Sequence, residues 1–252
     1  MWVYERGTGR AFCTSTSNIA HENYFYALID ANGVIDIDSI EQFLANDVEG
    51  PANQIIDKLK MFQPITLDEK QQLARYVTYM YSRVPRYRER IKDSLPQIIS
   101  ERLSMLQNSS KLLKKGSLDP ITNDDIDQRI EMVLKTAPDR LEQFLQLPHF
   151  YEPIYNVLMN MRWSFLVRQE PPYFLTSDNP FIFTEENGLG NEKAEIIFPL
   201  AKNVMLWATW KAKHKFIPIT ENIMEEVNKI VARNSTRFVF YCEDAEWVYK
   251  LV

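Results

Sequence analysis

An aspartate that follows a predicted strand is the residue best placed to do chemistry in this chain. Asp178 lies in residues 176–180, which read Thr-Ser-Asp-Asn-Pro and follow the apolar residues 173–175. A carboxylate at such a strand end can hold a metal ion or act as a base in hydrolysis. The same residue types also form turns, in which an aspartate accepts backbone N–H groups. The turn interpretation is favoured, and Asp178 is the candidate metal ligand in the alternative.

The sequence lacks the second motif that a metal-dependent nuclease requires. A nuclease of the restriction type needs a Glu-x-Lys motif on the next strand, where the lysine positions the attacking water. Residues 195–197 read Glu-Ile-Ile, so an isoleucine occupies the lysine position. No cofactor is predicted, and a divalent metal on Asp178 is the less favoured alternative.

A run of arginines offers a different chemistry. Arg83, Arg86 and Arg90 would share one face if a helix continued through them, and Tyr79 or Tyr87 could stack on a base. This arrangement suits the phosphates of a nucleic acid. The favoured alternative is a helix kinked at Pro85, with arginines that pair with residues 11–56, where there are seven acidic side chains and no lysine or arginine.

Composition narrows the class of protein. The formal charge is −5 and the pI is about 5.4, which argues against an obligate nucleic-acid coat protein. No apolar stretch has the length of a membrane span, and the first residues do not resemble a secretory signal. A cytoplasmic protein is therefore expected, with Cys13 and Cys242 packed as small hydrophobic residues and not joined in a disulfide.

Periodicity divides the chain into strand-rich ends and a helical middle. Residues 1–14 read as a β-hairpin, and strand signals return after residue 172. We therefore predict an α+β fold in which both chain ends form a small, mostly antiparallel sheet, interrupted by a long all-helical insert. The prediction is one domain over residues 1–252, made of a hairpin and loop (1–37), a helical section (38–168) and a sheet-forming section with one helix (172–252). Strands are predicted at 173–176, 181–183, 194–198, 204–210, 236–241 and 246–252, and helices at 51–62, from 66 to Pro85, from 94, from 122, at 152–167 and at 220–234.

Several weak motifs occur in an order that resembles a known family. They include Trp-Val-Tyr at 2–4, His-Glu-Asn-Tyr-Phe-Tyr at 21–26, Thr-Ser-Asp-Asn-Pro at 176–180 and Phe-Pro-Leu at 198–200. The chain resembles the bacterial domain-of-unknown-function family numbered four-two-three-eight over nearly its whole length. The resemblance implies no established activity, substrate or cofactor. It implies that the recurring polar residues form one cluster where the helical insert meets the sheet, and these residues are Glu41, Arg83, Asp178, Asn179, Asn228 and Arg237.

The resemblance also bears on the start of the sheet. Members typically carry a His-Tyr-Val-Pro segment about twenty residues ahead of the Trp-Val-Tyr strand, and this sequence has nothing before Met1. The resemblance therefore implies that the edge beside Trp2 and Tyr4 is exposed, or is covered by a protein partner or a second copy.

Two functional hypotheses follow. In the favoured one, the chain is a non-catalytic interaction or regulatory protein whose polar cluster is structural. In the alternative, it is a metal-dependent phosphodiesterase or nuclease-like hydrolase. Asp178 and Asn228 are then the candidate catalytic residues, and the candidate substrate-binding residues are Glu41, Arg83, Asn179 and Arg237.

Overall fold

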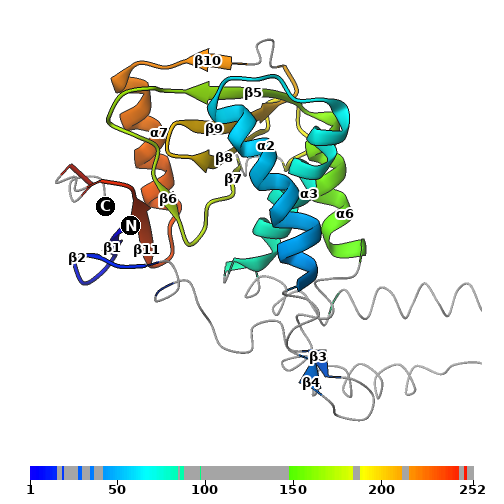
Figure 1. The fold of residues 1–252 in the computed structure, drawn as a ribbon, viewed down its shortest axis with the longest axis horizontal. Coiled ribbons are helices and arrows are strands. Elements are labelled where there is room, and N and C mark those ends of the chain that lie inside the picture. Colours follow the sequence, from blue (N-terminus) through cyan, green and yellow to red (C-terminus); the bar gives the residue numbers. More distant parts are fainter. Residues whose placement is uncertain are drawn as a thin grey trace, which may run out of the picture.

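The described residues form two main β-sheets and one short two-stranded sheet, with helices between and beside the two main sheets (Figure 1). The computed structural model describes residues 1–15, 19, 28–29, 35–36, 42–84, 86–87, 97, 148–183, 188–211, 216–243 and 247–248. The α+β class is confirmed. The predicted helices that begin at 94 and 122 lie outside the described residues.

The smaller sheet joins the two ends of the chain, as predicted. Its order is β2 (Arg10–Cys13), β1 (Trp2–Glu5), β11 (Phe238–Tyr241) and β6 (Thr176–Ser177), with all pairs antiparallel. The β1–β2 turn contains Gly7 and Gly9 at φ values of 82° and 68°, which glycine adopts without strain.

One expectation about this sheet is wrong. The edge beside Trp2 and Tyr4 is not open, because β1 pairs with β2 on one side and with β11 on the other. Trp2 lies opposite Tyr241, and Tyr4 lies opposite Val239. The strand that completes the sheet comes from the far end of the chain, which a local reading of the hairpin does not reveal. Among the described strands, β2 is the one at that edge.

The larger sheet has five strands. Its order is β10 (Phe216–Pro218), β5 (Arg162–Val167), β9 (Val204–Thr209), β8 (Glu195–Ala201) and β7 (Ile182–Phe183). The β10–β5 pair is parallel and the others are antiparallel. The strands predicted at 194–198 and 204–210 are thereby confirmed as β8 and β9.

Strand β5 corrects the predicted helix over 152–167. The helix α6 (Pro148–Asn160) ends before Met161, and the chain then runs as a strand with Ser164 to Val167 buried. A short apolar run buried on both faces has no clear period, so it cannot be told from a helical segment by spacing alone. The aromatic residues Trp163 and Phe165 favour the strand.

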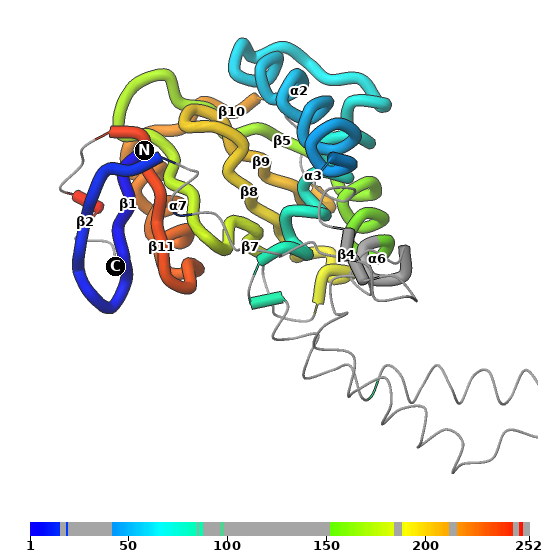
Figure 2. Tube along the Cα trace, turned by 60° about the horizontal axis from the view of Figure 1, so that its bottom comes forward, coloured from blue at the N-terminus to red at the C-terminus, as the bar shows by residue number. Residues whose placement is uncertain are grey.

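The helices cover both faces of the five-stranded sheet (Figures 1 and 2). On one face α2 (Gly50–Lys60), α3 (Leu67–Arg83) and α6 form a core with β5, β8 and β9. On the other face α7 (Glu221–Asn234) buries its apolar side against that sheet and the smaller one. Helix α7 therefore lies between the two sheets. Its core residues are Met224, Val227, Val231 and Ala232.

Local signals set the helix boundaries. Helix α3 begins with a capping box, in which Thr66 accepts from the Glu69 N–H and the Glu69 carboxylate accepts from the Thr66 N–H. It ends at Arg83, because Val84 precedes a proline and is extended. The end predicted at Pro85 is confirmed. A π-helix, Leu44–Glu49, leads into α2.

Four further features complete the description. Two residue pairs, Leu28–Ile29 and Ile35–Asp36, form the short hairpin β3–β4. Both cysteines are free, as predicted, but they are exposed and not packed in the core, because Cys13 ends an edge strand and Cys242 follows the end of β11. Trp247 and Val248 lie in a 3-10 turn and not in the strand predicted at 246–252, whose other residues lie outside the described part. Among the described helices, none is long and apolar enough to cross a membrane.

Candidate functional site

Asp178 binds the backbone of the segment that enters β11. Its Oδ1 accepts the N–H of Thr236 at 2.8 Å, and its Oδ2 accepts those of Arg237 at 2.7 Å and Phe238 at 3.1 Å. Its own N–H donates to the Phe238 carbonyl at 3.1 Å. A carboxylate has about four lone-pair positions, so backbone donors occupy most of them. This is the geometry that the turn interpretation predicts, with partners 58 to 60 residues away.

Asn228 joins α7 to the chain that leads into β6. Its side chain is fully buried, at 0% exposure. Its Oδ1 accepts the Leu175 N–H at 3.0 Å, and its Nδ2 donates to the Tyr173 carbonyl at 2.8 Å. The amide therefore replaces the strand partner that this stretch of backbone lacks. A group sealed in this way has no access to a substrate.

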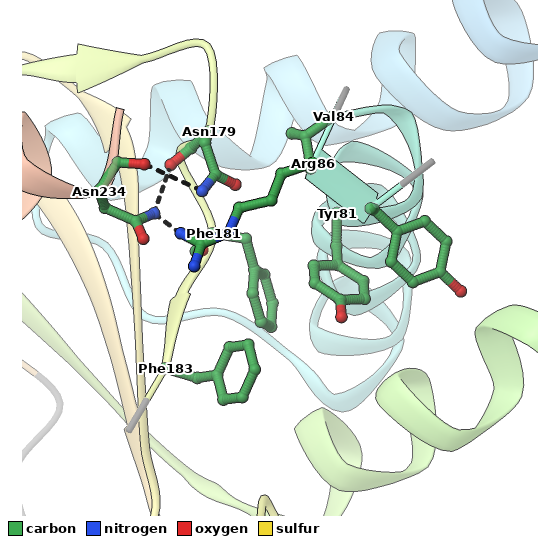
Figure 3. A pocket seen from close by; sticks show the side chains of 8 residues that line it. Tyr81, Val84, Arg86, Asn179, Phe181, Phe183 and Asn234 are labelled. Atoms are coloured by element: carbon green, nitrogen blue, oxygen red, sulfur yellow. Dashed lines mark hydrogen bonds between the residues drawn. The ribbon is translucent and has the colours of Figure 1, made fainter. Parts of the chain in front are cut away.

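Asn179 and Asn234 bind each other's backbone (Figure 3). Asn179 Nδ2 donates to the Asn234 carbonyl at 3.0 Å, and Asn234 Nδ2 donates to the Asn179 carbonyl at 2.7 Å. Asn234 Nδ2 also lies 3.3 Å from the Phe181 carbonyl. The pair fixes the last residue of α7 to the chain between β6 and β7.

Arg237 pairs with Glu5 across the β1–β11 ladder. Its Nε and Nη2 donate to Glu5 Oε1 at 2.9 and 2.7 Å, and the Thr8 hydroxyl lies 3.2 Å from Oε2. The Glu5 side chain is 12% exposed, whereas that of Arg237 is 66% exposed. The hydrogen bonds from Arg237 hold the pKa of the Glu5 carboxyl below its ordinary value of 4.5, with a smaller contribution from Thr8. Glu5 is thus an ionised carboxylate in the smaller sheet, and Arg237 balances its charge.

The Glu5–Arg237 pair gives a prediction about pH. A carboxyl whose pKa is lower in the folded state adds stability above its ordinary pKa and loses it as the pH falls through the folded value. The Arg237→Gln variant should therefore be less stable than the wild type at pH 7. This difference should shrink as the pH falls below 4.5. Urea unfolding at a series of pH values measures it.

The matched control for that series is Arg233→Gln, which changes an exposed arginine on the last turn of α7. Its stability difference from the wild type should stay small at every pH. A deficit of Arg237→Gln that does not vary between pH 7 and pH 3 would contradict the assigned ion pair.

Two of the three predicted arginines, Arg83 and Arg86, are not on the same continuous helix. Arg83 is at the end of α3 and pairs with Glu49, which is one of the acidic residues in the 11–56 region. Helix α3 ends at Arg83 and does not continue to Arg86, and the nucleic-acid interpretation stays a prediction. Arg86 is exposed and points toward Asn234 and Phe181 (Figure 3). Arg90 and Glu41 lie outside the described residues.

Together these residues form a polar clasp, which we define as Glu5, Asp178, Asn179, Asn228, Asn234 and Arg237. The clasp ties the chain between β5 and β7 to α7 and to both ends of the protein. Asp178, Asn179, Asn228 and Arg237 belong to the clasp, whereas Arg83 of the helical insert pairs with Glu49. The single cluster at the junction of the insert and the sheet stays a prediction. Sequence reasoning missed Glu5 and Asn234. Glu5 could have been found as a charged residue two positions after Val3, which is fully buried in the same strand. Asn234 could have been found as an asparagine at a helix end.

The hydrogen bonds of the clasp connect separate parts of the chain. Its donors and acceptors bind backbone groups or each other. Among the described residues, no group of three or more histidine, cysteine, aspartate or glutamate side chains is placed to hold a metal ion. Asp178 therefore belongs to no such group in the described part of the chain.

Comparison with known proteins identifies a family without an assigned activity. The family model described as "Protein of unknown function (DUF4238)" matches residues 1–245. This range includes every residue of the clasp. No curated protein and no solved structure matches the chain.

Proposed function

The chain belongs to this family of proteins of unknown function, and we propose from its own residues that it is a non-catalytic binding protein in which the polar clasp is structural. The observation that supports the proposal is the coordination of Asp178 by three backbone N–H groups. A catalytic carboxylate must have its oxygens free to contact a proton or a metal ion. Here backbone amides take that place.

The burial of Asn228 supports the same proposal. The hydrolase hypothesis needs Asp178, Asn228 and Arg83 to contact one substrate. Asn228 is fully buried and holds two backbone groups, while Arg83 pairs with Glu49. The clasp is a network of polar groups that are hydrogen-bonded within the protein, and such networks specify one arrangement of the chain.

The proposal extends to the place of action and the partner. We place the protein in the cytoplasm, which agrees with its two free, exposed cysteines. Strand β2 is the edge at which a partner or a second copy could add a strand to the smaller sheet, since β1 is already paired on both sides.

Thermal unfolding with divalent metal tests the proposal. A ligand that binds only the native state raises the midpoint, so Mg²⁺ or Mn²⁺ at millimolar concentration should leave the midpoint of the full chain unchanged. Hydrolysis of a simple phosphodiester should stay at the level of buffer. The matched control is Asp57→Asn, which changes an exposed aspartate paired with Lys60. A metal-dependent rise that Asp178→Asn abolishes and Asp57→Asn retains would overturn the proposal.

A further inference from the structure

A groove runs along the outer strand β10, beside the loop that joins α2 to α3. It consists of two adjoining cavities with volumes of about 220 and 450 Å³, which share Phe216 as a wall. Volumes of this size fit small ligands. Most of the lining is apolar, and the apolar residues are Phe62, Pro64, Ile65, Leu67, Trp163, Phe165, Val167, Phe216, Pro218 and Ile219.

Four aromatic rings form a continuous row in this groove. The ring centroids of Trp163 and Phe165 lie 6.4 Å apart, those of Phe165 and Phe216 lie 5.4 Å apart, and those of Phe216 and Phe62 lie 5.9 Å apart. Rings at these separations attract one another. The row gives the groove a rigid apolar wall that links its two cavities.

Phe62 adopts a backbone conformation that suits glycine better. It has a φ of 57° and follows the C-terminus of α2, where Phe62 N–H donates to the Leu59 carbonyl and Gln63 N–H to that of Lys58. Glycine is usual at this position of such a helix end. A bulky residue in a strained conformation often marks a functional site. Because phenylalanine stands here in place of glycine, its ring forms a wall of the groove.

The loop between α2 and α3 exposes more apolar surface, at Met61 before Phe62 and at Leu67 in the groove lining. Met61 is 62% exposed and Leu67 is 65% exposed, and these are the two largest such values among the described hydrophobic residues. Both flank the loop that carries Phe62. Exposed apolar side chains gathered beside an apolar groove are typical of binding sites.

Lys70 supplies a positive charge at one end of the groove. Its Nζ donates to the carbonyls of Met159 and Met161 at 2.8 and 2.9 Å and lies 5.2 Å from the centroid of the Trp163 ring. Burial lowers the pKa of this amine. No carboxylate pairs with it in the described part of the chain. An ammonium group has three donors, so one is left for a ligand.

From this arrangement we propose that the groove binds an elongated apolar molecule that carries one carboxylate, with the carboxylate near Lys70 and the apolar chain along the aromatic row. An acyl chain with a carboxylate end has this chemistry. The Lys70 ammonium group would pair with the carboxylate of the ligand. The row of aromatic rings would contact its apolar chain.

A peptide fits the groove less well. Each peptide residue brings a backbone donor and acceptor that need partners. The edge strand β10 is short and contains Pro218, which has no N–H to offer. The polar residues that line the cavities are Thr66, Lys70, Arg168, Gln169 and Glu170, and of these Arg168 already donates to the carbonyls of Pro171 and Pro172. The structure therefore favours a hydrocarbon chain.

Calorimetric titration of the full chain with decanoate tests this inference. Decanoate should bind, and decanol, which has the same chain without the acid, should bind about tenfold more weakly because a charge-assisted hydrogen bond is lost. The Lys70→Met variant should lose this preference for the acid. Equal binding of decanoate and decanol by the wild type, or no binding of decanoate, would overturn the proposal.

A second variant avoids the contacts that Lys70 makes with α6. Leu67→Asp changes an exposed residue at the first position of α3, where an acidic side chain suits the helix dipole. It should fold normally and weaken decanoate binding about tenfold through lost apolar contact and charge repulsion. The control Ile223→Asp, in the first turn of α7 and outside the groove lining, should bind as the wild type does.

Two other results would also count against the inference. Equal weakening by Leu67→Asp and Ile223→Asp would show that the ligand does not bind in the groove. Tighter binding of a short peptide with an apolar C-terminus than of decanoate would show that the groove is built for a protein partner. Neither result depends on Asp178, so this inference and the proposed function fail separately.

Discussion

The Asn228→Leu variant is expected to be less stable than the wild type by about 4 kcal/mol, since one buried and one partly buried backbone group would each lose a hydrogen bond at a cost of about 1–3 kcal/mol. Leucine has nearly the shape of asparagine, so packing changes little. It cannot accept from the Leu175 N–H or donate to the Tyr173 carbonyl. Both groups would then lie unpaired beside a residue with 0% exposure. Urea unfolding followed by circular dichroism measures the change.

The control for this variant is Asn222→Leu. Asn222 lies in the first turn of the same helix and is exposed. Its replacement should change the free energy of unfolding by less than about 0.5 kcal/mol, as surface substitutions usually do. If Asn228→Leu were as stable as Asn222→Leu, the assigned role of Asn228 in the clasp would be wrong.

The Asp178→Asn variant should lose about 2–3 kcal/mol of stability, because hydrogen bonds to a charged group contribute about 1.5–3 kcal/mol and only part of them can be replaced. The amide keeps one acceptor oxygen, while its NH₂ group would face backbone donors. Thr236 and the pair Arg237 and Phe238 lie on different oxygens of the carboxylate, so at least one of these contacts must break.

The sign of that change separates the two hypotheses. Carboxylates that serve catalysis or metal binding are commonly kept at a cost to stability, so their removal is neutral or stabilising. A structural carboxylate behaves in the opposite way. Asp57→Asn serves as the control here too, because an exposed ion pair such as Asp57–Lys60 contributes little.

The local part of the clasp could be predicted from sequence, and the distant part could not. The residues around Asp178 indicated a turn with an aspartate that accepts backbone N–H groups. Nothing in that segment indicates that the donors are residues 236–238, some 60 positions away. The pairing of Asn228 with residues 173 and 175 is equally distant along the chain. Contacts of this kind depend on how the sheets and α7 pack, which single-sequence periodicity does not encode.

The errors in the predicted fold also arise because distant parts of the chain pack together. The residues of β5 predict the end of a helix, because a strand buried on both faces shows no alternation. The hairpin residues predict an edge beside Trp2 that is exposed or covered by a partner, because its second neighbour, β11, comes from the other end of the chain. Helix limits, by contrast, follow from adjacent residues. The helix start at residue 66 and the stop before Pro85 are therefore predicted correctly.

The aromatic groove shows a further limit of sequence reasoning. Phe62, Trp163 and Phe216 come from three separate segments and carry no common motif. Lys70 reads as an ordinary polar residue of an amphipathic helix, and only the packing of α6 against α3 places its amine near Trp163. The strained conformation of Phe62 also has no signal in its residue type, because glycine is expected there.

Amide hydrogen exchange at three positions tests the central claim most directly. If the Asp178 carboxylate holds the backbone that enters β11, the amides of Thr236, Arg237 and Phe238 should exchange slowly in the wild type. In Asp178→Asn they should exchange faster, by more than amides in the core of β9 do. Unchanged protection at these three amides, together with unchanged or increased stability of Asp178→Asn, would contradict the structural role and point to a functional one.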